Sequence, residues 1–339
     1  MYVKNAWYVA AWSKELVHSL RHLTIMNQPV LLYRTQAGEA VALEDRCCHR
    51  RVPLHRGALV GDNVQCGYHG FTFNCRGTCV SIPNQEQIPP SAKVSTYPIC
   101  ERHHLVWIWM GEPDHADPTL VPDFSILSDA THAWQQDYMH AKANYRLITD
   151  NLNDLSHLTF VHSSTIGNQA TALADLSVQS DEHGVVQTRW MINTPPPPTY
   201  RRLAGFDQNI DRWQRITFLP PSNVQIRTGG RRVSSGERSF EGTDVIGMYA
   251  LHAITPETET TSHYFWAQTH DFRIDEPEVT QALFLEIQRA FHEDLEVFAA
   301  QQQSILQDPN NEEVNCRADR AQLLARRLVD RMLEAPTAA

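Results

Sequence analysis

The sequence has no run of eighteen consecutive apolar residues, and therefore no candidate membrane-spanning helix. The sequence also has fewer positive than negative side chains, with 29 Lys and Arg against 39 Asp and Glu. The resulting net charge of −10 argues against a nucleic-acid partner. No internal repeat is visible, and four prolines at 195–198 form the sole low-complexity tract. The first eight residues read as a folded strand and lack the shape of a signal peptide. We therefore expect a globular, cytoplasmic protein with no membrane partner.

Cysteine is too irregular for a disulfide framework, because the chain has seven of them, an odd number. Two occur in short mixed pairs, Cys47-x-His49 and Cys66-x-x-His69. Together these pairs offer two thiolates and two imidazoles, a ligand set that suits either a structural zinc or a Rieske [2Fe–2S] cluster. Pairs of mixed type favour the cluster, in which the two cysteines hold one iron and the two histidines hold the other. Zinc remains the alternative from these residues alone.

The distribution of β-rich runs, turns and helical periods predicts two domains of α+β class. Residues 1–115 read as short strands separated by turns, and we expect an N-terminal all-β domain. Residues 116–134 are rich in Pro and Asp and are expected to form a linker. In residues 135–339 strand-like segments precede two long helices, at 277–308 and 317–334. This pattern predicts a catalytic domain with an antiparallel sheet and flanking helices, of the helix-grip type.

A second group of polar residues lies between 144 and 162. Asn151 and Asp154 fall on the apolar stripe of a predicted helix, where burial is costly unless each finds a partner. His157 and His162 follow, five residues apart, which is about 140° around an ideal helix. They can bind the same ion only if the helix is bulged or ends between them.

The long helix at 277–308 offers a further ligand, since Asp294 lies on the apolar stripe that contains Leu283 and Phe291. A carboxylate there needs a cation or a donor network. Two histidines and one carboxylate form the facial triad of non-haem Fe(II) oxygenases. A local ion pair between Asp294 and Arg289 is the alternative. An iron–sulfur cluster beside an Fe(II) site would make a chemical unit, because the cluster can deliver single electrons.

The complete pattern of these residues resembles the α subunit of Rieske non-haem iron oxygenases. The resemblance extends over nearly the whole chain and is strongest to the branch that includes vanillate and dicamba O-demethylases and toluenesulfonate methyl-mono-oxygenase. It implies that Cys47, His49, Cys66 and His69 hold the [2Fe–2S] cluster and that His157, His162 and Asp294 bind a mononuclear Fe(II). It further implies a homotrimer, alone or stacked as a hexamer, in which Asp154 bridges to His69 of a neighbouring copy and Asn151 lies near the iron.

The function implied by the resemblance is that of a terminal oxygenase. NADH would reduce a separate reductase that carries a flavin and a [2Fe–2S] centre, and this partner would pass electrons to the Rieske cluster. With O2 as co-substrate, the enzyme would demethylate or hydroxylate a methyl group of a small aromatic anion. Ring cis-dihydroxylation uses the same metals and is the alternative reaction. An electron carrier and a zinc-stapled binding protein are alternatives of another class.

The substrate pocket is expected within the strands of the second domain. Its candidate wall residues are aromatic or histidine side chains on strand-like segments: Trp190, Trp213, His252 and Trp266. Of these, His252 is favoured, because the resemblance places a donor for the substrate anion at the matching position. Arginines between 201 and 232 offer a second way to bind a carboxylate or sulfonate.

Overall fold

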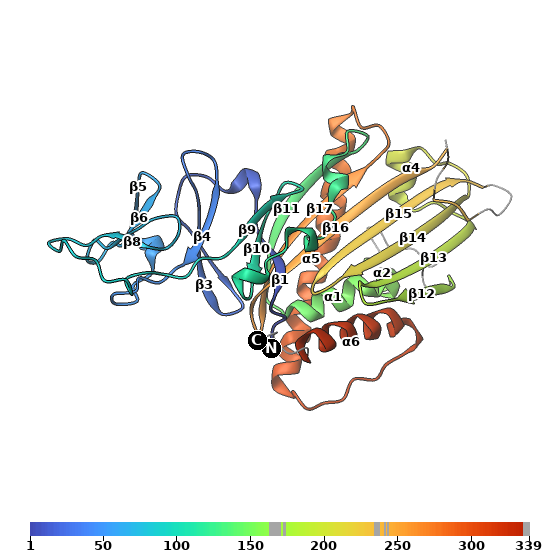
Figure 1. Ribbon diagram of the computed structural model, residues 1–339. Coiled ribbons are helices and arrows are strands. Elements are labelled where there is room, and N and C mark those ends of the chain that lie inside the picture. The colour runs from blue at the N-terminus through green and yellow to red at the C-terminus, as the bar shows by residue number, and fades with distance from the viewer. Residues whose placement is uncertain (163–170, 172–173, 234–237, 241, 243, 335–339) are drawn as a thin grey trace. The chain divides into compact units, whose positions relative to one another are not determined.

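The computed structural model describes residues 1–162, 171, 174–233, 238–240, 242 and 244–334. These residues form two compact units. One contains Tyr2–Asp123 together with Thr255–Thr258, and the other contains Phe124–Ile254 and the chain from Glu259 onward. The secondary structure of the two units (Figure 1) confirms the mixed α+β class.

The N-terminal unit contains three small antiparallel sheets. Their orders are β1-β10-β9, β2-β3-β4 and β5-β6-β7-β8. The strands are β1 (Ala6–Trp12), β2 (Arg21–Ile25), β3 (Gln28–Arg34), β4 (Ala40–Glu44), β5 (Ala58–Val60), β6 (Asn63–Gln65), β7 (Thr72–Phe73), β8 (Cys79–Ser81), β9 (Ile99–Arg102) and β10 (Leu105–Met110). Every residue of β1 and β10 is buried, which explains why both strands are apolar without alternation.

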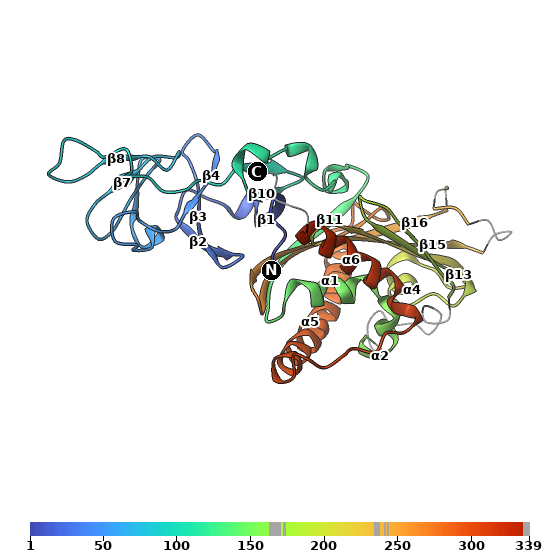
Figure 2. The ribbon, with the colours of Figure 1, turned by 60° about the horizontal axis from the view of Figure 1, so that its bottom comes forward.

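The C-terminal unit is built on one seven-stranded antiparallel sheet of order β11-β17-β16-β15-β14-β13-β12. Helices lie against one face of this sheet (Figure 2). The strands are β11 (Ala133–Ala141), β12 (Leu176–Ser180), β13 (Val185–Thr194), β14 (Ile210–Leu219), β15 (Asn223–Arg232), β16 (Ile246–Thr258) and β17 (Thr261–His270). Side chains on adjacent residues of these strands point to opposite faces, so alternate residues face the helices.

The helices of this unit are α1 (Tyr145–Asn153), α2 (Leu158–Val161), α4 (Pro198–Ala204), α5 (Pro277–Gln307) and α6 (Arg320–Glu334). Both long helices expected from the sequence are present, as α5 and α6. The apolar stripe of α5 is also confirmed, because Leu283, Phe291 and Asp294 are all buried. No helix in the described part of the chain combines the length and apolar character needed to cross a bilayer.

Helix α1 ends before the two histidines that follow it. Asp154 has extended backbone angles (φ −135°, ψ 100°), which stops α1 at Asn153. A short 3-10 turn, Leu155–His157, follows immediately, and α2 then runs to Val161. The predicted helix therefore ends before both histidines and not between them, and a change from 3-10 to α geometry separates His157 from His162.

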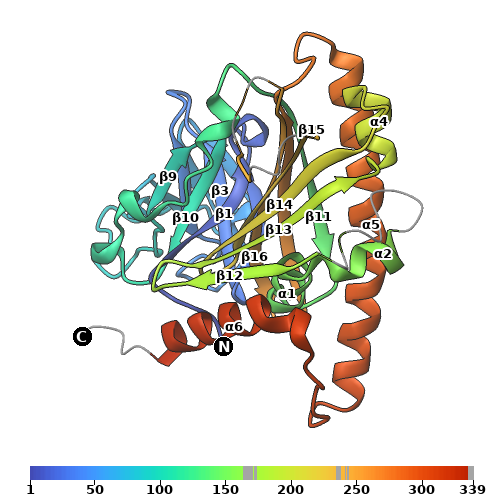
Figure 3. The same cartoon turned by 90° about the vertical axis from the view of Figure 1, so that its right-hand side faces the viewer.

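A partly buried ion pair joins α1 to α6, which cross near each other in Figure 3. Arg326 on α6 donates from Nε (2.9 Å) and Nη2 (2.7 Å) to Oδ2 of Asp150 on α1. Burial raises the pKa of Asp150 to about 6, although Arg326 opposes the shift. The pair holds in place the helix from which the two histidines follow.

Removal of Arg326 should therefore destabilise the C-terminal unit. We expect Arg326→Met to lower the free energy of unfolding by about 3 kcal/mol at pH 7, because Asp150 is left buried without its cation. The loss should shrink as the pH falls toward 5, since protonated Asp150 needs no partner. Urea unfolding followed by circular dichroism measures both effects. Arg327→Met, on the exposed side of α6, is the control, and equal stability of the two variants at pH 7 would contradict this role.

Candidate active site and metal centres

The two Cys–His loops of the N-terminal unit have the same backbone hydrogen-bond pattern. In the first, the Cys47 amide donates to the carbonyl five residues later, and the amide four residues later donates to the Cys47 carbonyl, each over 2.9 Å. The same bonds recur around Cys66, at 2.8 and 3.1 Å. The residue four positions after the cysteine has a positive φ in both loops, +61° at Arg51 and +74° at Gly70. The two loops thus form a quasi-symmetric pair.

The side chains of these loops converge. The His49 and His69 rings lie 4.7 Å apart between centroids, and Cys47 and Cys66 are both buried. Burial, together with the neighbouring Cys66, raises the pKa of the Cys47 thiol to about 11. Nδ1 of His49 is buried without a hydrogen-bond partner in the described structure. Two adjacent buried thiols and an unpartnered imidazole nitrogen fit an iron–sulfur cluster, because bound iron would satisfy all of them.

Two glycines bring the loops together. A Cβ atom on Gly57 would lie 1.9 Å from the carbonyl oxygen of Gln65, and one on Gly67 would lie 2.7 Å from that of Arg56. The loops thus pack backbone against backbone, which no larger residue would allow without a shift.

Asp45 anchors the first loop and was not identified from the sequence. Its buried carboxylate accepts hydrogen bonds from the His55 amide (2.8 Å), from Nδ1 of His55 (2.5 Å) and from Nδ1 of His22 (2.6 Å). These contacts tie the turn at Leu54–Arg56 to the residue two positions before Cys47.

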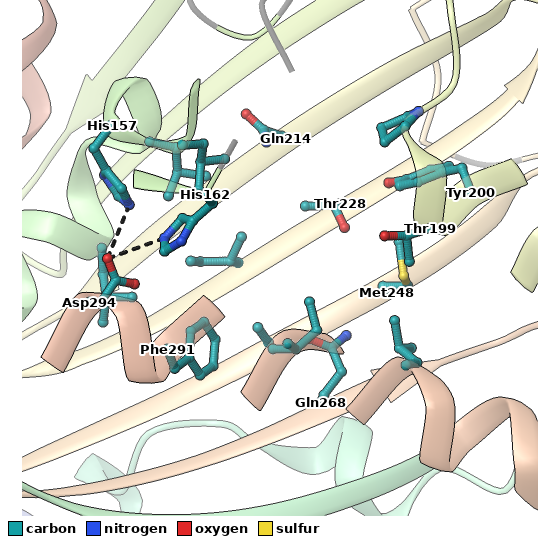
Figure 4. Close-up of a pocket in the computed structure, with 18 of the residues that line it drawn as sticks. His157, His162, Thr199, Tyr200, Gln214, Thr228, Met248, Gln268, Phe291 and Asp294 are labelled. Carbon is teal, nitrogen blue, oxygen red and sulfur yellow. Dashed lines mark ion pairs between the residues drawn. The ribbon is translucent and has the colours of Figure 1, made fainter. Parts of the chain in front are cut away.

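The C-terminal unit brings His157, His162 and Asp294 together (Figure 4). Their ligand atoms all lie within 4.8 Å of one another. Nε2 of His162 is 3.2 Å from Oδ1 of Asp294, and Nε2 of His157 is 3.7 Å from the same oxygen. Asn151 donates from Nδ2 to this oxygen as well, over 3.2 Å. Two imidazoles and one carboxylate on one side of a cavity fit a mononuclear Fe(II).

The orientation of both rings is fixed by bonds at Nδ1. Nδ1 of His157 lies 2.6 Å from the backbone carbonyl of Asp154, and Nδ1 of His162 lies 2.7 Å from Oε2 of Glu293. Both Nε2 atoms therefore face Asp294. Burial lowers the pKa of His157, which favours the neutral form that binds metals.

Glu293 was not identified from the sequence, because its position off the apolar stripe of α5 predicts a solvated side chain. Its side chain is 27% exposed, yet it forms the carboxylate–histidine contact that typically supports a metal ligand. The sequence feature that could have identified Glu293 was its position directly before Asp294.

Within its own chain, Asp154 contacts Ser156 and Arg189. Its carboxylate accepts from the amide (2.9 Å) and hydroxyl (2.7 Å) of Ser156, and Nη2 of Arg189 lies 3.5 Å away. Its contact with His157 is made through the backbone carbonyl. The Asp154 side chain remains 16% exposed, so part of it faces outward.

A cavity of about 800 Å³, including its open mouth, extends from the three ligands (Figure 4). It lies between the helix-covered face of the sheet and helices α1, α4 and α5. Most of its wall is apolar, with Leu152, Leu155, Leu158, Met248, Ile287 and Phe291 among the lining residues. Polar groups in the wall include Gln214, Thr228 and Gln268.

The four pocket residues expected from the sequence do not line this cavity. His252 and Trp266 lie behind Phe291, with ring centroids 5.2 and 4.8 Å from its ring. Trp213 on β14 and its cross-strand neighbour Trp190 on β13 contact Phe240 instead. Adjacent positions of a strand face opposite sides of the sheet, and the β14 residues that line the cavity are Arg212 and Gln214.

Two known protein families each match one part of the chain. The Rieske [2Fe-2S] domain matches residues 6–98, and the vanillate O-demethylase oxygenase C-terminal domain matches residues 141–335. The chain therefore belongs to the Rieske non-haem iron oxygenases, in the vanillate O-demethylase branch.

Individual relatives are similar over nearly their full length. The toluene-4-sulfonate monooxygenase system iron–sulfur subunit of Comamonas testosteroni is 39% identical, with 99% of this chain and 98% of the relative covered. The vanillate O-demethylase oxygenase subunit of a Pseudomonas strain is 33% identical, with 99% and 96% covered. The crystal structure of dicamba monooxygenase bound to 3,6-dichlorosalicylic acid superposes with a TM-score of 0.92 at 31% identity, covering 100% of this chain and 99% of that one.

These findings confirm the enzyme class and cofactors expected from the sequence. The chain is the oxygenase component of a Rieske mono-oxygenase system, with a [2Fe–2S] cluster, a non-haem iron and O2 as co-substrate. Such components work with a separate reductase. A zinc-stapled binding protein and a pure electron carrier are thereby excluded.

Glu293 should control how tightly the mononuclear iron is held. We expect Glu293→Gln to weaken Fe(II) binding by about 10- to 100-fold, as loss of a carboxylate behind a histidine ligand typically does. Fe(II) titration of protein stripped of mononuclear iron but retaining its cluster measures the change. Glu296→Gln, an exposed glutamate one turn along α5, is the matched control. Wild-type affinity in Glu293→Gln would contradict the assignment.

Proposed function

We propose that this chain oxidises a methyl group of a small aromatic anion, by O-demethylation or by hydroxylation of a ring methyl. The observation that carries the proposal is the opening of the His157–His162–Asp294 site into a mostly apolar cavity (Figure 4). A mostly apolar wall with a few polar groups is typical of small-molecule sites. The relatives named for toluene-4-sulfonate and vanillate support an anionic arene.

Each part of the chain has a proposed role. Residues 1–115 would form the Rieske domain, 116–134 the linker and 135–339 the catalytic domain. Cys47, Cys66, His49 and His69 would hold the cluster, and His157, His162 and Asp294 the iron. All seven cysteines are free, and iron-bound thiolates suit a reducing compartment such as the cytoplasm.

In the reaction, the iron when bound supplies activation of O2, with electrons delivered through the cluster. Asn151 holds Asp294 by its amide, which keeps the carboxylate oriented toward the two imidazoles. Leu155, Leu158 and Phe291 surround the reacting carbon with apolar atoms and exclude water. A hydroxylated O-methyl group collapses to a phenol and formaldehyde, whereas a hydroxylated ring methyl gives a stable alcohol.

Asp154 would connect the two metal centres across copies of the chain in a homotrimer. Two observations support this role. His69 is exposed on the N-terminal unit, and Asp154 is partly exposed on the C-terminal one. A carboxylate between His69 of a neighbouring copy and the His157 segment would orient both groups.

The mononuclear site is tested by its carboxylate. We expect Asp294→Ala to keep the brown cluster colour and to lose at least about 100-fold in turnover, because the iron loses a ligand. NADH oxidation is measured with reductase and 4-methoxybenzoate, vanillate or toluene-4-sulfonate, and formaldehyde, benzylic alcohol and diol are each assayed. His292→Ala, an exposed histidine on α5, is the control.

If Asp294→Ala retained turnover, the assignment of Asp294 as a ligand of the mononuclear iron would be wrong. A cis-diol from the wild-type enzyme, without formaldehyde or alcohol, would replace the proposed reaction by ring dihydroxylation.

The bridging role is tested by Asp154→Asn. We expect this variant to bind both metals and to slow electron transfer between cluster and mononuclear iron by at least about tenfold, since the amide carries no negative charge for His69 of a neighbouring copy and has one acceptor oxygen in place of two. Single-turnover cluster oxidation in the presence of substrate and O2 gives the rate. Ser156→Ala, which keeps the Asp154 carboxylate but removes one of its donors, should change the rate far less. A wild-type rate in Asp154→Asn would rule out the bridge.

A further inference from the structure

An arginine side chain is buried in the wall of the cavity. Arg212 on β14 is 3% exposed and lines the cavity that opens from His157, His162 and Asp294. Its Nε and Nη1 atoms are buried and have no hydrogen-bond partner in the described structure. No carboxylate among the described residues forms an ion pair with it. The cavity wall thus contains a cation that no carboxylate of the described residues pairs with.

Burial of an unpaired guanidinium is costly, and arginine cannot escape the cost by losing its proton. Burial does lower the pKa of Arg212, but from a value so high that the group stays charged at neutral pH. An anion that enters the cavity from solution would remove this penalty.

The neighbouring residues make space for Arg212 without neutralising it. Its cross-strand partner on β15 is Gly230, where a Cβ atom would lie 3.1 Å from Cε1 of Tyr200. The Tyr200 ring therefore lies close to the sheet, with its centroid 5.0 Å from Cζ of Arg212. The Tyr200 hydroxyl is also buried without a hydrogen-bond partner in the described structure. The guanidinium of Arg212 and the hydroxyl of Tyr200 thus lie side by side in the cavity wall.

A second buried arginine shows the difference. Arg231 on β15 also has unpartnered Nε and Nη2 atoms, but its cross-strand partner is Asp211. Directly opposed residues share a face of the sheet, so Arg231 and Asp211 lie together on the face opposite to Arg212. Arg231 does not line the cavity.

The position of Tyr200 shows that the two ends of the cavity differ. Figure 4 shows Tyr200 and Thr199 at one end, and His157, His162 and Asp294 at the other. The anion-binding donors and the metal ligands therefore lie at opposite ends of a mostly apolar space. This arrangement matches an arene with an anionic substituent on one side and a methyl or methoxy group on the other.

We propose that Arg212, supported by Tyr200, is the receptor for the carboxylate or sulfonate of the substrate and points the opposite side of the ring toward the metal ligands. The proposal rests on the proposed function and deepens it. It also replaces His252 as the anion donor. Burial lowers the pKa of His252 to about 3, so that this ring is neutral, and its Nδ1 contacts the Tyr264 hydroxyl at 2.7 Å.

The test compares matched anionic and neutral probes. Isothermal titration calorimetry of the holoenzyme under argon gives dissociation constants for toluene-4-sulfonate against toluene-4-sulfonamide, and for 4-methylbenzoate against 4-methylbenzamide. We expect Arg212→Met to weaken binding of the anions by about 10- to 100-fold, the effect of losing a charged hydrogen-bond donor. The neutral probes should change by less than about threefold, because they make no charge–charge contact. The sulfonate and carboxylate pairs show which anion the site prefers.

Three further variants keep the test decisive. Arg212→Lys retains the charge and should retain part of the preference for anions. It remains informative if Arg212→Met fails to fold. Tyr200→Phe should weaken the anions by a smaller factor. Arg231→Met is the matched control and should leave all four dissociation constants unchanged.

If Arg212→Met weakened the binding of anionic and neutral probes equally, Arg212 would only form part of the cavity wall. That result would overturn the proposal. Loss of anion preference in His252→Gln, with Arg212→Met unaffected, would assign the receptor to His252. Formaldehyde or benzylic alcohol formed from neutral arenes by Arg212→Met would show that the proposed oxidation stands even where the anion receptor fails.

Discussion

The end of helix α1 at Asn153 is the constraint on which the catalytic site depends. His157 and His162 lie five residues apart, about 140° around an ideal helix, so one regular helix through both could not direct them to one ion. The break after Asn153 precedes both residues, and the 3-10 turn ends at His157, so that His162 follows on the turn after it. The extended backbone of Asp154 and the 3-10 turn after it redirect the chain, so that both Nε2 atoms face Asp294 on α5. The same residue caps the turn through its side chain and holds His157 through its carbonyl. Its contacts with Ser156 and His157 are thus a consequence of how the helix ends.

Both metal centres use backbone geometry to bring together groups that are costly to bury. In the N-terminal unit, two loops with the same hydrogen bonds place two thiols side by side, and Gly57 and Gly67 allow the close approach. In the C-terminal unit, Asp294 is buried on an apolar helix face and is satisfied by Asn151 and the histidines. Arg212, at the far end of the cavity, is also costly to bury, but its partner must come from outside the chain.

The sequence was sufficient to predict which candidate ligands lie together, because their chemistry is visible in short spacings: mixed Cys–His pairs, two histidines after a helix, and an aspartate on an apolar stripe. It was insufficient for the residues that support them. Asp45 and Glu293 act through contacts with His22, His55 and His162 that no local pattern reveals. The cavity wall was missed for a related reason. Aromatic residues on a strand can face either side, and only the packing of helices on one face decides which side holds the substrate.

The account depends most on the presence of two different iron centres in one chain. Analysis of the purified wild-type protein for iron, zinc and acid-labile sulfide, combined with electron paramagnetic resonance of the reduced protein, tests this directly. The account predicts a Rieske signal, two sulfides, the two irons of the cluster and a third iron at the mononuclear site. A fully active protein that contains zinc in place of the cluster, or that holds no iron beyond the cluster, would contradict it.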